Sequence, residues 1–114
     1  MSKDPQILLV HILNSIKSLE KYSADLNKED FLKNEEKQDA IIRKIEVIGE
    51  AVSNLEHKFK ENYPNIPWQD IADMRNKLIH EYFSVDLELI WEVLQTDLKI
   101  FKDNISKIEA SLHD

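Results

Sequence analysis

The sequence predicts an all-α fold, an antiparallel up-and-down four-helix bundle with one extra short helical turn. One glycine and three prolines in 114 residues are too few for a fold built of hairpins and tight turns. Apolar residues instead recur every three or four positions along most of the chain, which is the period of an amphipathic helix. A chain of this length fits a single domain over residues 1–114, and because it has no cysteine its core must form without disulfides.

The first helix is expected over about residues 4–25, with Pro5 tolerated in its first turn. Its apolar face follows helical spacing and comprises Leu8, Ile12, Ile16, Leu19 and Leu26. Asn27 comes next, and because an asparagine side chain accepts a hydrogen bond from a free backbone N–H, we expect it to cap a short helical turn over residues 28–33.

The second helix is expected over about residues 35–61, where it stops before the two prolines of segment 63–67. Its apolar residues alternate in spacings of four and three: Ile41, Ile45, Ile48, Val52, Leu55 and Phe59. Gly49, the single glycine, lies inside this helix, where it costs about 1 kcal/mol relative to alanine. We therefore expect another helix to approach closely at Gly49.

A third helix is expected over residues 68 to about 80, with Pro67 placed to start it. The fourth, about residues 86–112, is capped by Ser84 or Asp86. Its apolar positions again alternate by four and three: Leu87, Trp91, Leu94, Leu98, Phe101, Ile105, Ile108 and Leu112. We expect Trp68 and Trp91 to anchor the bundle or a dimer.

The charge balance limits the possible partners. Fifteen Lys plus Arg against twenty-two Asp plus Glu give a net charge of −7, so any nucleic-acid contact has to be a local site working against the overall field. The longest apolar run near the N-terminus, residues 7–10, has four residues and is too short for a signal peptide or a membrane span. We expect a soluble cytoplasmic protein without membrane contact.

One segment, residues 75–83, suggests chemistry. It holds Arg75, one of two arginines against thirteen lysines, whose planar guanidinium suits phosphate. If the third helix continues, Asn76 and His80 share a face opposite Ile71, Leu78 and Tyr82 and point away from the core. An exposed histidine beside an amide is compatible with acid–base catalysis, but from these residues alone a solvated histidine with an arginine near the helix end is the more common explanation.

The residues Arg75-x4-His80-x-Tyr82 resemble the RX4HXY signature of the HepT-like branch of the HEPN ribonucleases, the toxin half of a toxin–antitoxin pair. The flanking sequence is also similar to this family, namely residues 45–51, 66–68, 81–83, 85–86 and Trp91, whereas the family more often has glycine at the positions of Asp73 and Ser84. The resemblance extends over most of the chain. It implies metal-independent RNA cleavage, without cofactor, in which a ribose 2′-hydroxyl attacks the adjacent phosphate.

The resemblance also implies roles for individual residues. His80 takes or delivers the proton, Arg75 holds the phosphate and stabilises its developing charge, and Asn76 orients one of the two. On an ideal helix, residues five apart differ by about 140°, so Arg75 and His80 of one chain do not converge. Either the helix breaks near His80 or a second chain completes the site. Because HEPN proteins form dimers with both motifs at a shared cleft, we expect a homodimer.

Tyr82 corresponds to the tyrosine that, in HepT-like proteins, receives AMP from a nucleotidyltransferase antitoxin of the MntA type. The resemblance therefore implies the toxin of a type VII toxin–antitoxin system, which is inactivated when Tyr82 is adenylylated, because bulk and negative charge then lie beside Arg75. Without the family, a core tyrosine is an equally good interpretation. The alternative function is a non-catalytic docking or substrate-binding subunit of a minimal nucleotidyltransferase. The net charge of −7 favours this alternative, whereas the presence of both Arg75 and His80 favours the toxin.

Two further groups of polar residues lie outside the motif segment. Glu46 and Glu50 lie four apart on the second helix and repel each other unless a cation is near, such as Arg43, Lys44 or Arg75. They either support the site or belong to a solvated face. The other histidines show no metal-ligand spacing, so no metal site is expected: His11, His57 and His113.

Overall fold

The computed structural model describes residues 4–74, 79–80 and 84–112, and within them the fold is all-α apart from one pair of two-residue strands. A π-helical turn, η1, joins the last two helices. The elements in chain order are α1 (Pro5–Ser23), α2 (Lys28–Lys33), α3 (Glu35–Asn54), α4 (His57–Glu61), α5 (Trp68–Ala72), β1 (Ile79–His80), β2 (Ser84–Val85), α7 (Leu87–Glu92), η1 (Val93–Asp97) and α8 (Leu98–Leu112).

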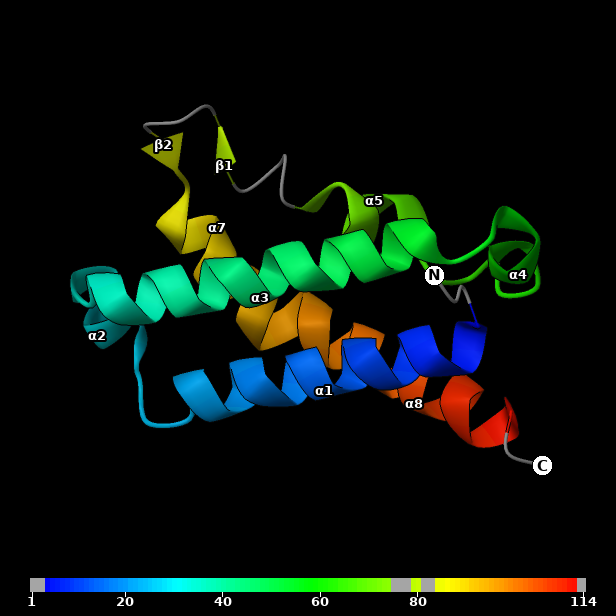
Figure 1. Ribbon diagram of the computed structural model, residues 1–114. Helices are drawn as coiled ribbons and strands as arrows, with labels where there is room; N and C mark the ends of the chain where they lie inside the picture. Colours follow the sequence, from blue (N-terminus) through cyan, green and yellow to red (C-terminus); the bar gives the residue numbers. More distant parts are fainter. Residues whose placement is uncertain (1–3, 75–78, 81–83, 113–114) are drawn as a thin grey trace.

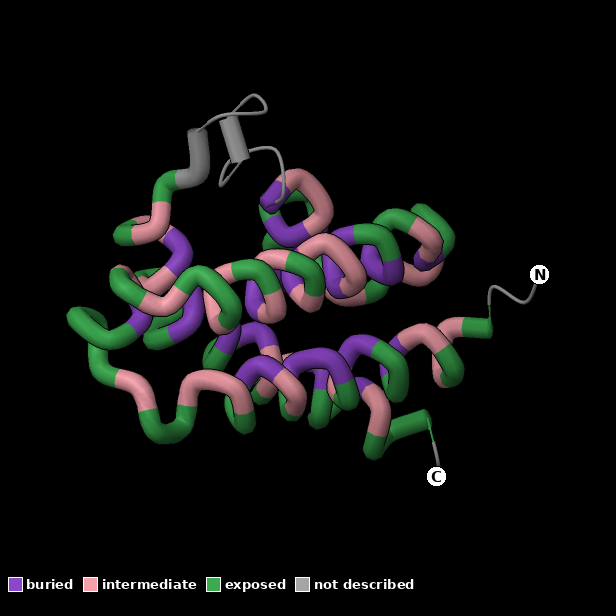
Figure 2. Tube along the Cα trace, turned by 60° about the vertical axis from the view of Figure 1, so that its left-hand side comes forward, coloured by how far each residue is buried: buried purple, intermediate pink, exposed green. Residues whose placement is uncertain are grey.

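The helices form the expected up-and-down bundle. In Figure 1, α1 and α3 run antiparallel side by side, α5 lies along α3, and α8 lies along α1. The sides of these helices that face each other carry the buried residues, drawn in purple in Figure 2. The central residues of the two predicted apolar faces are indeed buried, namely Ile12, Ile16, Leu19, Ile41, Ile45, Ile48, Val52 and Leu55. The all-α prediction is therefore confirmed.

Side chains cap the helices where local sequence predicts it. The Asn27 carboxamide oxygen accepts a hydrogen bond from the backbone N–H of Asp30 at 2.8 Å and starts α2. The Asp86 carboxylate accepts one from the N–H of Leu89 at 3.0 Å and starts α7. Of the two candidate caps for the last helix, Asp86 is therefore the one used, and Ser84 lies in β2 instead.

The second predicted helix is wrong at its end: α3 stops at Asn54, and Leu55 is extended. A continuous helix over residues 35–61 would be about 40 Å long and would outrun α1, its 19-residue neighbour. The break keeps Leu55 buried at 2% exposure and starts α4 in a new direction. The carbonyl of Val52 accepts two hydrogen bonds there, one from the backbone N–H of Leu55 at 3.1 Å and one from the Lys60 ammonium at 3.2 Å.

The third predicted helix is also too long, because α5 ends at Ala72 and Ile79–His80 form strand β1. The aromatic side chains explain where α5 is held. The Trp68 ring packs edge-on against Phe101 of α8, with centroids 6.2 Å apart, and its indole N–H donates to the carbonyl of Tyr63 at 3.1 Å. These contacts hold the first turn of α5 against α8 and against the segment that precedes α5.

The last predicted helix is interrupted by the π-helical turn η1. The extra residue in that turn shifts the buried stripe, so Ile90 and Val93 are buried, whereas Leu87 and Trp91 are only partly covered. Trp91 still serves the bundle by packing on Phe31 of α2, with ring centroids 5.5 Å apart. At the C-terminal end of α8, the buried face ends at Ile108, and Leu112 is 39% exposed.

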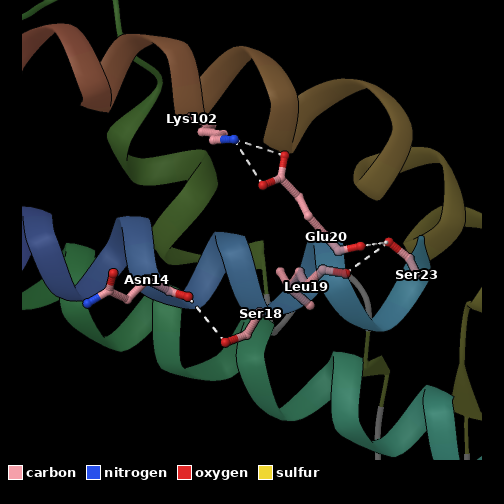
Figure 3. Close-up of polar contacts among 6 residues, drawn as sticks. All are labelled: Asn14, Ser18, Leu19, Glu20, Ser23 and Lys102. Carbon is pink, nitrogen blue, oxygen red and sulfur yellow. Dashed lines mark hydrogen bonds and ion pairs between the residues drawn. The ribbon is translucent and has the colours of Figure 1, made fainter.

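Two contacts tie the helices together away from the core centre. Gly49 is buried in α3, and a Cβ there would lie 3.2 Å from the carbonyl oxygen of Ala72, so the expected close approach is made by α5. On the opposite side, the Lys102 ammonium binds both carboxylate oxygens of Glu20, at 2.9 and 3.1 Å, and links α8 to α1 (Figure 3).

Candidate functional site

The motif segment joins α5 to α7. Of the residues expected to act there, Arg75, Asn76 and Tyr82 lie outside the described residues. His80 is in β1, and its backbone is paired with that of Ser84 in an antiparallel ladder in which Ile79 also pairs with Val85. The expectation that Asn76 and His80 share the face of one helix is wrong, because His80 is not helical.

The end of α5 at Ala72 and the strand at His80 bear on the geometric difficulty raised by the sequence. Arg75 and His80 would diverge by about 140° only if one regular helix carried both. Because His80 lies in a strand, one regular helix does not carry both residues. Arg75 lies outside the described residues, so the convergence of the two side chains and dimerisation both stay predictions.

A cavity of about 370 Å³ lies where the motif segment leaves and re-enters the bundle. Its walls come from both sides of that segment: α5 and Met74 on one side, and α7, η1 and α8 on the other. Met74 directly precedes Arg75 in the chain, and Leu89 follows three residues after Asp86. We call this cavity the stem pocket. It is lined by Pro67, Asp70, Ile71, Met74, Leu89, Val93, Asp97, Ile100, Phe101 and Asn104.

The stem pocket has an apolar floor and a polar rim. Four buried residues make the floor, namely Ile71, Met74, Val93 and Phe101. Two exposed carboxylates, Asp70 and Asp97, and the half-buried Asn104 make the rim. The side chain of Asp97 has no hydrogen-bond or ion-pair partner among the described residues. A cavity of this size, mostly apolar with a few convergent polar groups, has the character of a small-ligand site.

The two α3 carboxylates lie differently. Glu50 is exposed and lines a second hollow, of about 460 Å³, between α1 and α3. The same hollow is lined by His11, Arg43 and Lys44. Of the three cations expected as possible neighbours of Glu50, Arg43 and Lys44 therefore line the same hollow as Glu50. Glu46 is half-buried and does not line either of these hollows.

Within the described part of the chain, no three His, Asp or Glu side chains gather closely enough to hold a metal ion. In the same residues, no helix is both long and apolar enough to cross a membrane.

The stem pocket itself was missed by the sequence analysis. Leu89, Val93 and Asp97 are spaced by four, and in a regular α-helix eight residues overshoot two full turns by about 80°. The wider turn of η1 offsets this drift and lets all three line one cavity. The four-residue spacing of Leu89, Val93 and Asp97 was the available signal in the sequence. On a regular helix these three residues would not share one face, so the spacing predicts a common cavity only once the π-helical turn is known.

The chain is similar over most of its length to proteins named as ribonucleases. The family profile described as "Ribonuclease HepT-like" matches residues 12–108. A Methanocaldococcus jannaschii protein named "Gamma-glutamylcyclotransferase and putative RNase" is 48% identical over 112 residues, which make up 98% of this chain but only 50% of that protein. Another protein of that organism, a "Putative RNase", is 40% identical over 95% of this chain and 93% of its own length. The "Probable ribonuclease HepT" of Thermococcus cleftensis is 37% identical over 95% of this chain and 98% of its own. No solved structure matches the chain.

Proposed function

This chain belongs to the HepT-like ribonuclease family, and on that premise we propose that it is a metal-independent endoribonuclease, the toxin of a type VII toxin–antitoxin pair. The observation that carries the proposal is that the family match over residues 12–108 includes Arg75-x4-His80-x-Tyr82. Relatives of nearly the same length carry ribonuclease names, which supports an RNA substrate. The break of α5 before His80 supports a site that is not built on one continuous helix.

In the proposed reaction, the nucleophile belongs to the substrate. The ribose 2′-oxygen attacks the adjacent phosphorus, the bond to the 5′-oxygen breaks, and the products carry a 2′,3′-cyclic phosphate and a 5′-hydroxyl. His80 takes the proton from the 2′-hydroxyl or delivers one to the leaving oxygen. The Arg75 guanidinium neutralises the non-bridging oxygens as charge builds on them, and Asn76 orients the histidine or the phosphate.

The proposal includes a homodimer whose two motif segments share one cleft. A two-fold axis would bring the Arg75 of one protomer toward the His80 of the other, and it would put twice the positive charge at the scissile phosphate. Local concentration of cations matters here because the chain as a whole carries a net charge of −7.

Regulation is proposed to act on Tyr82 through an antitoxin of the MntA type. Its phenol oxygen would attack the α-phosphorus of ATP, forming a phosphodiester to AMP and releasing pyrophosphate. The attached AMP would add bulk and a negative phosphate two residues from His80, and it would exclude RNA by both volume and charge.

The test is cleavage of single-stranded RNA in the presence of a metal chelator. His80→Ala and Arg75→Ala should each lower the cleavage rate by about 10²–10⁴, because each removes a group acting in the transition state. Two matched controls are available: His57→Ala removes an exposed histidine of α4, and Arg43→Ala removes the other arginine, which is also exposed. Both controls should cleave at the native rate.

Further readouts separate the proposal from its alternative. Cyclic-phosphate ends, and loss of cleavage in a sample whose intact mass shows adenylylation, are expected of the toxin. Sedimentation should give a dimer for the native protein and for all four variants. A folded dimer that cuts none of a varied set of RNAs would instead favour the docking subunit of a separate nucleotidyltransferase.

A further inference from the structure

We propose that the stem pocket binds a nucleobase of the RNA, with a preference for guanine, and so selects where the chain is cut. This inference rests on the proposed ribonuclease function, which it deepens by naming the base next to the scissile phosphate. The pocket has about 370 Å³ of free volume, which lies within the usual range of small-ligand sites.

The position of the pocket connects it with the motif segment. Met74 lines the pocket and is bonded in the chain to Arg75, the proposed phosphate ligand. On the other side, Leu89 and Val93 line it from the helix that follows the segment. The proposal therefore puts the base of a nucleotide in this cavity and its phosphate at Arg75, the residue that follows Met74 in the chain. Proteins that recognise single-stranded RNA commonly splay out a base beside the bound phosphate and hold it in such a pocket.

The floor of the pocket suits the face of a planar ring. Phe101 lines the pocket, is 2% exposed and packs edge-on against Trp68, with ring centroids 6.2 Å apart. Ile71, Met74 and Val93 complete an apolar surface, and all three are less than a tenth exposed. Bases flipped out of a strand are typically gripped between aromatic and aliphatic side chains in this way.

The rim selects among the bases by its acceptors. A carboxylate accepts hydrogen bonds only, and guanine presents two adjacent donors, N1–H and the N2 amino group, on one edge. Uracil offers a single donor between two carbonyls that a carboxylate repels. Of the two carboxylates, Asp97 is the better candidate to accept hydrogen bonds from guanine. It has no partner among the described residues, whereas Asp70 already takes part in an interaction.

The acidic rim also sets the orientation of the bound nucleotide. Asp70 and Asp97 repel phosphate, so the base enters and the sugar–phosphate backbone stays outside, toward the motif segment. The π-helical turn that carries both Val93 and Asp97 brings floor and rim into one cavity. Such turns are often found at functional sites, and here the turn has a geometric effect on a ligand cavity.

Binding of free mononucleotides tests the proposal without relying on cleavage. The intact protein is titrated with GMP, IMP, AMP and UMP in separate experiments, by NMR chemical shifts or calorimetry. We expect GMP to bind about tenfold more tightly than IMP, which lacks only the N2 amino group, because one hydrogen bond to a carboxylate is lost. Equal affinities for all four nucleotides, or no binding of GMP, would overturn the proposal.

Two substitutions make the test specific to the pocket. Asp97→Asn keeps the shape of the side chain and should reduce the preference for GMP over IMP to less than about twofold. Asp103→Asn removes the same charge from an exposed position of α8 that does not line the pocket, and it should leave the preference unchanged. If both variants behave alike, the effect is one of overall charge and the assignment of Asp97 is wrong.

The remaining outcomes distinguish this inference from the proposed function. GMP binding without any RNA cleavage would retain the base site and remove the ribonuclease. Cleavage without preference for guanine, and without GMP binding, would retain the ribonuclease and remove the base site.

A second copy of the chain seated in the pocket would give a third result. Ile100, which lines the pocket and is 59% exposed, would then lie in a contact between copies. In that case Ile100→Glu should change the sedimentation of the protein, and the native dimer should not bind GMP, which overturns the proposal.

Discussion

Gly49 is the residue through which the bundle holds the start of the motif segment. The carbonyl oxygen of Ala72, the last residue of α5, lies 3.2 Å from where a Cβ of residue 49 would be, and that of Ile71 lies 3.6 Å away. Both oxygens belong to the backbone, which cannot rotate aside as a side chain would. The sequence indicates that something approaches Gly49, and the structure shows that it is the helix leading to Arg75.

A larger side chain at Gly49 should therefore separate α3 from α5. We expect Gly49→Leu to lower the free energy of unfolding by about 1–3 kcal/mol, because the added atoms meet backbone, and overpacking of this kind is costly. Asp39→Leu, at an exposed position in the same helix, gains similar helix propensity without the contact and should change stability by less than about 0.5 kcal/mol. Urea denaturation measures both, and equal effects of the two substitutions would contradict the role given to Gly49.

At the scale of whole helices, the packing of α8 on α1 is stabilised more by buried apolar side chains than by the ion pair between them. The ion pair of Lys102 and Glu20 joins α8 to α1 with two short contacts, at 2.9 and 3.1 Å, yet the two side chains are 31% and 45% exposed. Water therefore screens much of their attraction. Ile16 of α1 and Leu98 of α8, which line one small hollow together with Glu20, are each 2% exposed, so burial holds the two helices together.

A double-mutant cycle with Lys102→Ala and Glu20→Ala should give a coupling free energy of about 0.2–1 kcal/mol at low salt. It should become smaller in 1 M salt, because exposed charges are screened over about 3 Å at that ionic strength. A coupling above about 2 kcal/mol, or one that salt does not reduce, would show that the pair is shielded from water and contributes more than its exposure indicates.

The charge of the whole molecule opposes its proposed substrate. A net charge of −7 repels the RNA backbone at long range, so attraction has to come from a few cations at the motif segment. The chain differs in this respect from basic RNA-binding proteins, whose affinity comes mostly from many phosphate contacts. An acidic protein surface is therefore consistent with an RNA interface that contacts few phosphates and recognises one base locally.

The salt dependence of RNA binding reports how many phosphates are contacted. Each contact on a single strand contributes about 0.7 to the slope of log affinity against log salt concentration, so we expect a slope smaller than about 2 in magnitude. The variant His80→Ala, for which we propose a loss of cleavage, allows binding to be measured on intact RNA. A slope of about 5 or more would mean an extended basic surface, which the charge of the chain does not provide, and would contradict local binding.

The sequence by itself determined the helical class, the buried face of α3 through Ile41, Ile45 and Ile48, and the cap at Asn27, because these depend on residues within a few positions of each other. It left the cap of the last helix open between Ser84 and Asp86, and the structure uses Asp86. The RX4HXY pattern likewise located the candidate segment without any coordinates. Only the tertiary structure decided where α3 and α5 end, where the π-helical turn falls and that a cavity opens beside Met74. Those features depend on how long the neighbouring helices are and on contacts such as Trp68 with Phe101, which join residues far apart in the chain.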